Sequence, residues 1–108
     1  MNNQTDIQRL RSSADQAHQL LKALANRDRL LLLCQLVDGE RNVGELEELL
    51  GIVQPTLSQQ LAVLRREGLV DTRRGGKQVY YSVASREALA ILHTLYGLFC
   101  AEETPNEH

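Results

Sequence analysis

The chain has 108 residues, a formal net charge of −2 and a hydrophobic content of 43%, which is ordinary for one folded domain. No apolar run reaches the ~18 residues that a membrane-spanning helix requires, and residues 1–10 are too polar for a signal peptide. We therefore expect a single cytoplasmic domain over residues 1–108, with flexible tails at 1–5 and 102–108.

The beginning of the chain predicts two consecutive helices. Residues 6–25 place apolar side chains at spacings of three and four, which is the period of one helical face. Asn26 and Asp28 interrupt the pattern, and a second helix follows until Asp38 and Gly39, because glycine suits the position just past a helix. The apolar stripes expected on these helices are Leu10, Ala14, Ala17, Leu21 and Leu24 on the first, and Leu30, Leu33, Cys34 and Val37 on the second.

Two shorter amphipathic helices follow. The first spans residues 43–50 and is closed by Gly51. The second spans residues 55–67 and has Pro55 in its first turn, where proline fits well. Two short helices joined by a turn of about four residues that contains glycine have the form of a helix-turn-helix. The inward side chains expected on the second helix are Leu57, Leu61 and Leu64.

After Gly68 the pattern changes from helical to alternating, which predicts two strands at residues 69–73 and 77–83. Gly75 and Gly76 lie between them, and Gly-Gly favours a type I′ hairpin turn because both central residues need positive φ. On the second strand, one face is expected to carry Val79, Tyr81 and Val83, and the opposite face Gln78, Tyr80 and Ser82.

The last predicted helix covers residues 86–101, with Ser85 as its cap and Glu87 in its first turn. This helix is apolar on more than one side, so it must be buried on several sides, and in a small domain a second subunit supplies the additional wall. The predicted fold class is mainly α with a β-hairpin wing, in the order α-α-α-α-β-β-α. This order defines a winged helix-turn-helix.

The charges are unevenly distributed along the chain. Residues 38–48 carry five carboxylates and one arginine, whereas residues 65–77 carry five basic side chains and two carboxylates. A local basic stretch on an acidic chain fits a protein that touches DNA phosphates with one face. The charged surface of a protein-interaction domain gives the same pattern, so charge alone leaves both interpretations open.

The helix-turn-helix gives the basic stretch a more specific meaning. The second helix of such a motif lies in the major groove with its N-terminal residues toward the base edges. Glutamine pairs with adenine, hydroxyl groups bond bases or phosphates, and arginine reaches phosphates. The side chains expected at the DNA are Gln54, Thr56, Ser58, Gln59, Gln60 and Arg66 from the helix-turn-helix, and Arg73, Arg74 and Lys77 from the hairpin.

Four segments resemble the ArsR/SmtB family of repressors: 24–30 (LANRDRL), 43–46 (VGEL), 57–61 (LSQQL) and 64–70 (LRREGLV). The resemblance covers about residues 14–100. It implies a repressor that binds an inverted repeat in double-stranded DNA as a homodimer built from the first and last helices. The sequence offers no nucleophile–base pair, phosphate loop or open metal site, so we expect neither an enzyme nor a cofactor.

Many members of this family sense metals, but this chain departs from their patterns. Residues 43–49, where such sensors often carry a cysteine, contain no thiol. The last helix contains only one histidine, His93, and His18 and His108 complete no cluster with it. We therefore expect no metal site.

The two cysteines, Cys34 and Cys100, form no CxxC motif. Free cysteines are often small buried hydrophobic residues without a further role. Their placement nevertheless resembles the dithiol branch of the family, the BigR- and SqrR-like repressors. That resemblance implies that the reduced protein binds DNA, and that reactive sulfur species or oxidation link the thiols by a disulfide or polysulfide bridge and release the operator.

Two other functions remain open at this stage. The first is a repressor whose two thiols hold a thiophilic ion such as arsenite. The second is a winged-helix module that binds another protein and no DNA.

Overall fold

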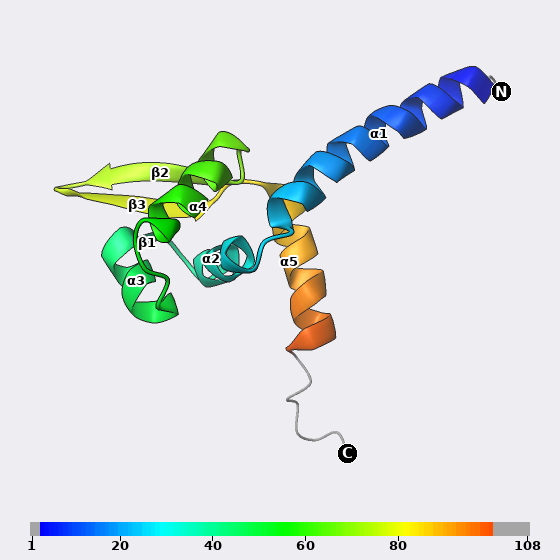
Figure 1. Cartoon of the computed structure of the whole chain (residues 1–108). Coiled ribbons are helices and arrows are strands. Elements are labelled where there is room, and N and C mark those ends of the chain that lie inside the picture. The colour runs from blue at the N-terminus through cyan, green and yellow to red at the C-terminus, as the bar shows by residue number, and fades with distance from the viewer. Residues whose placement is uncertain (1–2, 101–108) are drawn as a thin grey trace, which may run out of the picture.

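The computed structural model describes residues 3–100, with side chains from Asp6 onward, and in this part the chain forms five helices and three strands (Figure 1). The predicted order of four helices, a hairpin and a last helix is confirmed. The expected tails at 1–5 and 102–108 lie mainly outside the described residues, as does the predicted end of the last helix at Ala101. The elements are α1 (Asn3–Leu24), α2 (Arg27–Val37), β1 (Arg41–Asn42), α3 (Val43–Leu50), α4 (Thr56–Arg66), β2 (Val70–Gly75), β3 (Gln78–Val83) and α5 (Arg86–Phe99).

Side-chain caps fix the start of three helices. The Asn26 side chain accepts a hydrogen bond from the backbone N–H of Arg29 at 3.0 Å, and Ser85 caps α5 in the same way. Asn42 and Glu45 form a reciprocal capping box at the start of α3. Each such cap stabilises a helix by about 1 kcal/mol, so these polar residues set the boundaries that the apolar pattern leaves imprecise.

The three strands form one antiparallel sheet in the order β1-β3-β2. Strand β1 is not among the elements predicted from the sequence: Arg41 pairs with Tyr81 and Asn42 with Tyr80. Strand β1 joins the hairpin to the segment that leads into α3. The base of the wing is thereby attached to the helix-turn-helix.

The predicted hairpin turn is displaced by one residue. Gly75 belongs to β2 and pairs with Gln78, so the turn consists of Gly76 and Lys77. Gly76 has φ +64°, whereas Lys77 does not have positive φ. Positive φ at the first central residue alone is the pattern of a type II′ turn rather than the predicted type I′. The shift leaves Gly75 inside the sheet.

The core is built mainly from leucine side chains of α2, α3 and α4, with contributions from the hairpin and α5. The predicted inward residues of α4, Leu57, Leu61 and Leu64, are buried as expected. On α2 the buried residues are Leu32, Leu33 and Leu36, whereas Cys34 is exposed, contrary to its predicted place on the apolar face. Successive residues of an α-helix are rotated by about 100° about the helix axis. Cys34 therefore faces away from the side that Leu32, Leu33 and Leu36 bury.

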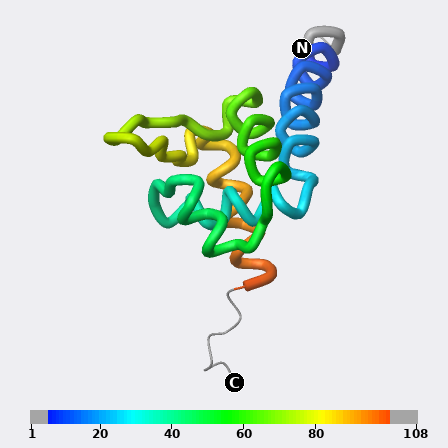
Figure 2. The backbone as a smooth tube through the Cα atoms, turned by 60° about the vertical axis from the view of Figure 1, so that its left-hand side comes forward, coloured from blue at the N-terminus to red at the C-terminus, as the bar shows by residue number. Residues whose placement is uncertain are grey.

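Helix α1 does not bury its predicted apolar stripe within this chain. In both views the N-terminal part of α1 extends away from the other helices (Figures 1 and 2). The wing, formed by β2 and β3, projects in a different direction. Leu10 is 68% exposed, and only Ala23 and Leu24, at the C-terminal end of α1, are buried. From Leu10 to Leu21 the stripe is therefore an apolar surface that no other part of the described chain covers, and only its last residue, Leu24, is buried.

Candidate nucleic-acid interface and cysteine pair

Helix α4 presents its N-terminal polar side chains outward. Ser58 and Gln59 are exposed and Thr56 is half-buried, while the leucines on the opposite face lie in the core. Pro55 provides no side-chain cap, and instead the Gln54 side chain accepts a hydrogen bond from the backbone N–H of Ser58 at 3.0 Å. Gln54 therefore holds the start of α4, and Ser58 and Gln59 remain accessible to a ligand.

Gln60 points toward the interior of the molecule rather than outward. It is half-buried, and its Oε1 accepts a hydrogen bond from Nη1 of Arg29 at 2.8 Å. The same guanidinium donates through Nε to the carbonyl of Ala23 at 2.6 Å and through Nη2 to the carbonyl of Lys22 at 3.3 Å. Arg29 thus ties α4 to the junction of α1 and α2.

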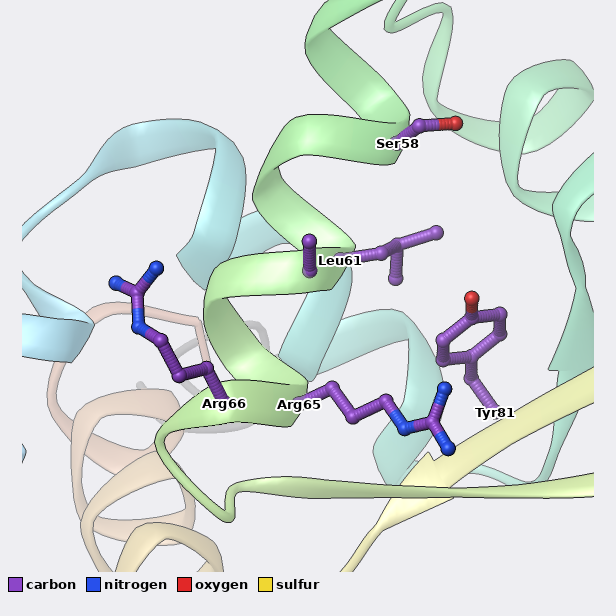
Figure 3. A pocket seen from close by; sticks show the side chains of 6 residues that line it. Ser58, Leu61, Arg65, Arg66 and Tyr81 are labelled. Atoms are coloured by element: carbon purple, nitrogen blue, oxygen red, sulfur yellow. The ribbon is translucent and has the colours of Figure 1, made fainter.

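A shallow groove of about 450 Å³ lies between α4 and the wing, and Figure 3 displays its lining side chains. Arg65 extends from α4 toward Tyr81 of β3, whereas Arg66 extends to the other side of the helix (Figure 3). Of these groove residues, Arg66 is predicted from the sequence to contact DNA, whereas Arg65 and Tyr81 are not. The groove is lined by Ser58, Leu61, Ala62, Arg65, Arg66 and Tyr81.

The three basic residues predicted for the wing have different environments. Arg74 and Lys77 are exposed near the hairpin turn. Arg73 donates through Nε to both carboxylate oxygens of Glu40 at 3.1 Å, and its guanidinium lies 4.8 Å from the centre of the Tyr80 ring. The hydrogen bonds from Arg73 lower the pKa of Glu40 below its usual value, so this carboxylate stays charged.

The two cysteines belong to elements that pack against each other, helix α2 and helix α5 with its C-terminal cap. Cys34 is on α2 and Cys100 directly follows α5, and both are free, exposed thiols. The surroundings of the Cys34 thiol desolvate it in part, and this burial is the larger cause of its raised pKa; repulsion from Cys100 is the second cause. The two cysteines thus belong to elements that pack together, and the charge of Cys100 influences the ionisation of Cys34.

The described residues contain neither a cluster of metal-ligating side chains nor a membrane-spanning helix. Among residues 3–100, no three side chains of His, Cys, Asp or Glu are grouped so that they could hold a metal ion. None of the helices in the described range is long and apolar enough to cross a membrane.

The helix-turn-helix of α3 and α4, followed by a basic hairpin and a helix with uncovered apolar faces, defines a winged helix-turn-helix DNA-binding protein. The profile of the family described as "Bacterial regulatory protein, arsR family" matches residues 26–72. The chain is also 51% identical over 90 residues to the "Biofilm growth-associated repressor" of Xylella fastidiosa, an alignment covering 83% of this chain and 79% of that protein. The chain therefore belongs to the arsR family of bacterial regulatory proteins, which are transcriptional regulators and not enzymes.

Two solved structures resemble the fold closely. Reduced HlyU from Vibrio cholerae superposes with a TM-score of 0.82 at 45% identity, covering 86% of this chain and 98% of that one. The homodimeric winged helix-turn-helix DNA-binding domain of Mb0332 from Mycobacterium bovis superposes with a TM-score of 0.72 at 33% identity, covering 83% of each chain. The predicted fold class and the predicted family are both confirmed.

Proposed function

We propose that this arsR-family repressor releases its operator when reactive sulfur species or an oxidant link Cys34 to Cys100. The observation that carries the proposal is the pair of free, exposed thiols whose charges interact across the contact of α2 and α5. The alternative of two small buried cysteines does not fit their exposure. One of the similar solved structures is that of reduced HlyU from Vibrio cholerae.

The bridge forms by two nucleophilic steps when the effector is an organic persulfide, RSSH. One cysteine thiolate attacks the outer sulfur of RSSH, which gives a protein persulfide and releases the thiol RSH. The second cysteine thiolate attacks the protein-bound sulfur, forms the Cys34–Cys100 disulfide and expels sulfide. Two thiols are oxidised, and the outer sulfur of the persulfide is reduced to hydrogen sulfide.

A longer bridge uses more of the same reagent. A second RSSH transfers one sulfur atom to the protein persulfide before closure and leaves as RSH, so that the final attack gives a trisulfide and the same sulfide product. Burial and the charge of Cys100 raise the pKa of Cys34, which lowers the fraction of this thiol in the reactive thiolate form.

Helix α2 provides a route from the bridge to the DNA-binding surface. It carries Cys34 and also Arg29, whose guanidinium holds Gln60 on α4. A covalent link between α2 and the end of α5 restrains both helices, and a displacement of α2 acts directly on the Arg29–Gln60 hydrogen bond. The orientation of α4 then changes relative to the second subunit.

We assign the DNA contacts to the outward face of α4 and to the wing. Thr56, Ser58 and Gln59 approach the base edges, and arginines near the end of α4 bind phosphates. Gln54 and Gln60 act by holding α4, because each already has a partner within the chain. The phosphate contacts comprise Arg65 and Arg66 on α4 and Arg74 and Lys77 on the wing.

The repressor acts as a homodimer on an inverted repeat. The apolar surfaces left open by the chain are on α1 and α5, where Leu10 is 68%, Leu98 70% and Phe99 76% exposed. Large apolar side chains left exposed on these two helices support a protein interface there. A homodimeric relative with the same fold supports the assignment.

The proposal is tested by operator binding of reduced and persulfide-treated protein, followed by fluorescence anisotropy, with intact mass read on each sample. We expect treatment to weaken binding and to produce a bridged mass, and we expect Cys34→Ser and Cys100→Ser to abolish both effects. Tight binding by fully bridged protein would remove the sulfur switch. Release by stoichiometric arsenite with no bridged mass would favour the thiophilic-ion sensor instead.

A further inference from the structure

Arg73 crosses the sheet instead of pointing away from it. The strand order is β1-β3-β2, and Arg73 on β2 lies opposite Tyr80 on β3, which lies opposite Asn42 on β1. The guanidinium passes over the Tyr80 ring and binds the carboxylate of Glu40, directly before β1. A single side chain thus connects the outer strand of the wing with the segment that leads into the helix-turn-helix.

Gly75 leaves the space that this arrangement needs. A Cβ atom at this position would lie 3.1 Å from Nη1 of Arg73 and 3.1 Å from Cε1 of Tyr80, closer than ordinary van der Waals contact. Its φ does not lie in the left-handed region, so the backbone alone would accept alanine. Glycine at position 75 is therefore explained by the close approach of Arg73 to Tyr80.

We propose that Glu40, Arg73, Tyr80 and Gly75 form a clamp that fixes the angle of the wing, and that Arg73 positions Arg74 and Lys77 instead of binding a phosphate itself. This inference rests on the proposed contact of the wing with the DNA backbone. The Nε and Nη2 donors of Arg73 both bind Glu40, and the carboxylate neutralises the charge of the guanidinium. Glu40 is a positioning residue, since it acts only through Arg73.

Replacing Glu40 distinguishes a phosphate-binding role of Arg73 from a positioning role, because the two roles predict opposite changes in operator affinity. If Arg73 binds a phosphate and Glu40 merely competes for it, Glu40→Gln removes a repulsive charge and tightens operator binding. If the two residues form a clamp, Glu40→Gln frees the wing and weakens binding by about 2- to 5-fold, the range of an exposed ion pair. Thermal unfolding of the variant verifies that the fold is kept.

Two further variants complete the experiment. Gly75→Ala places a Cβ atom 3.1 Å from the Arg73 guanidinium and from the Tyr80 ring, so these side chains must shift by a few tenths of an ångström without any change of charge. It is expected to weaken binding, but less than Glu40→Gln. The salt dependence of binding distinguishes Arg73→Gln from the matched control Arg74→Gln. Loss of one phosphate contact in each subunit, and so two in the dimer, lowers the slope of log K against log salt by about 1.8, at about 0.9 for each contact. We expect that decrease for Arg74→Gln and an unchanged slope for Arg73→Gln.

Each contrary result has a distinct meaning. Tighter binding by Glu40→Gln, or a reduced slope for Arg73→Gln, would overturn the clamp. Native affinity and slope for Arg74→Gln would overturn the wing's contact with DNA, and the positioning role with it. Neither result affects the sulfur switch, which is read from the cysteine variants in reduced and treated protein.

Discussion

The helix-turn-helix and the pair formed by α1 and α5 differ in how far one chain completes them. In the helix-turn-helix, apolar side chains such as Leu57, Leu61 and Leu64 are fully covered. On α1 and α5, equally apolar side chains such as Leu10 and Leu98 remain exposed. One chain therefore buries the core of the helix-turn-helix completely, whereas it leaves apolar side chains of α1 and α5 uncovered, as the proposed dimer interface requires.

The largest expected effect concerns the stability of the helix-turn-helix, whose core one chain buries completely. Leu61→Ala removes a fully buried side chain and is expected to lower the free energy of unfolding by about 2–5 kcal/mol in urea denaturation. The matched control is Leu49→Ala on α3, because Leu49 is 51% exposed and its truncation leaves no cavity. Equal losses for the two variants would mean that the core does not lie where the structure has it.

The next largest effect concerns dimerisation through α1, whose apolar side chains one chain leaves exposed. Leu10→Ser is expected to weaken dimerisation by about tenfold or more, the cost of leaving one apolar side chain out of an interface, in analytical ultracentrifugation. Its own subunit should lose little stability, because Leu10 packs against nothing in that subunit that buries it. Gln8→Ala, an exposed polar position on the same helix, serves as the control. An unchanged dimer would place the interface elsewhere.

A third prediction concerns the connection between the two regions. Arg29→Met keeps the aliphatic part of the side chain but removes all donors to Gln60, Ala23 and Lys22. We expect a loss of about 1–3 kcal/mol in stability and a smaller difference in operator affinity between reduced and bridged protein. A full difference with Arg29→Met would exclude this route of coupling.

The smallest expected effect concerns the reactivity of Cys34. Burial and the nearby Cys100 raise its pKa, so the thiol ionises, and is alkylated by iodoacetamide, at higher pH than a free cysteine. Cys100→Ser removes the repulsion but not the burial, so the pKa of Cys34 falls in part and its alkylation at neutral pH becomes faster. Equal rates in native protein and Cys100→Ser would show that the two sulfurs do not interact.

The sequence predicts those features that depend on neighbours in the chain. Helical spacing identifies Leu57, Leu61 and Leu64, and the local capping chemistry of Ser85 predicts the start of α5. The two-residue strand β1 is too short to display an alternating pattern, so the sequence gives no sign of it. Two consecutive glycines permit more than one turn frame, which explains the displacement of the hairpin turn by one residue.

Contacts between distant segments explain the remaining differences. The orientation of α2 is set by the elements packed around it, so helical periodicity alone did not reveal that Cys34 is exposed. Arg73 and Glu40 are 33 residues apart, and Arg29 and Gln60 are 31 residues apart. Composition identifies such side chains as charged or polar, but only the fold reveals which of them already have a partner and which remain free for DNA.

The sulfur switch is tested most directly by measuring the bridged fraction and the operator-bound fraction in the same samples. Protein is titrated with an organic persulfide, the Cys34–Cys100 bridge within one subunit is quantified by mass spectrometry of peptides, and binding is read by anisotropy. The account predicts that the released fraction rises in step with the bridged fraction and that a thiol reductant reverses both. Operator binding that persists when nearly every subunit is bridged would contradict it.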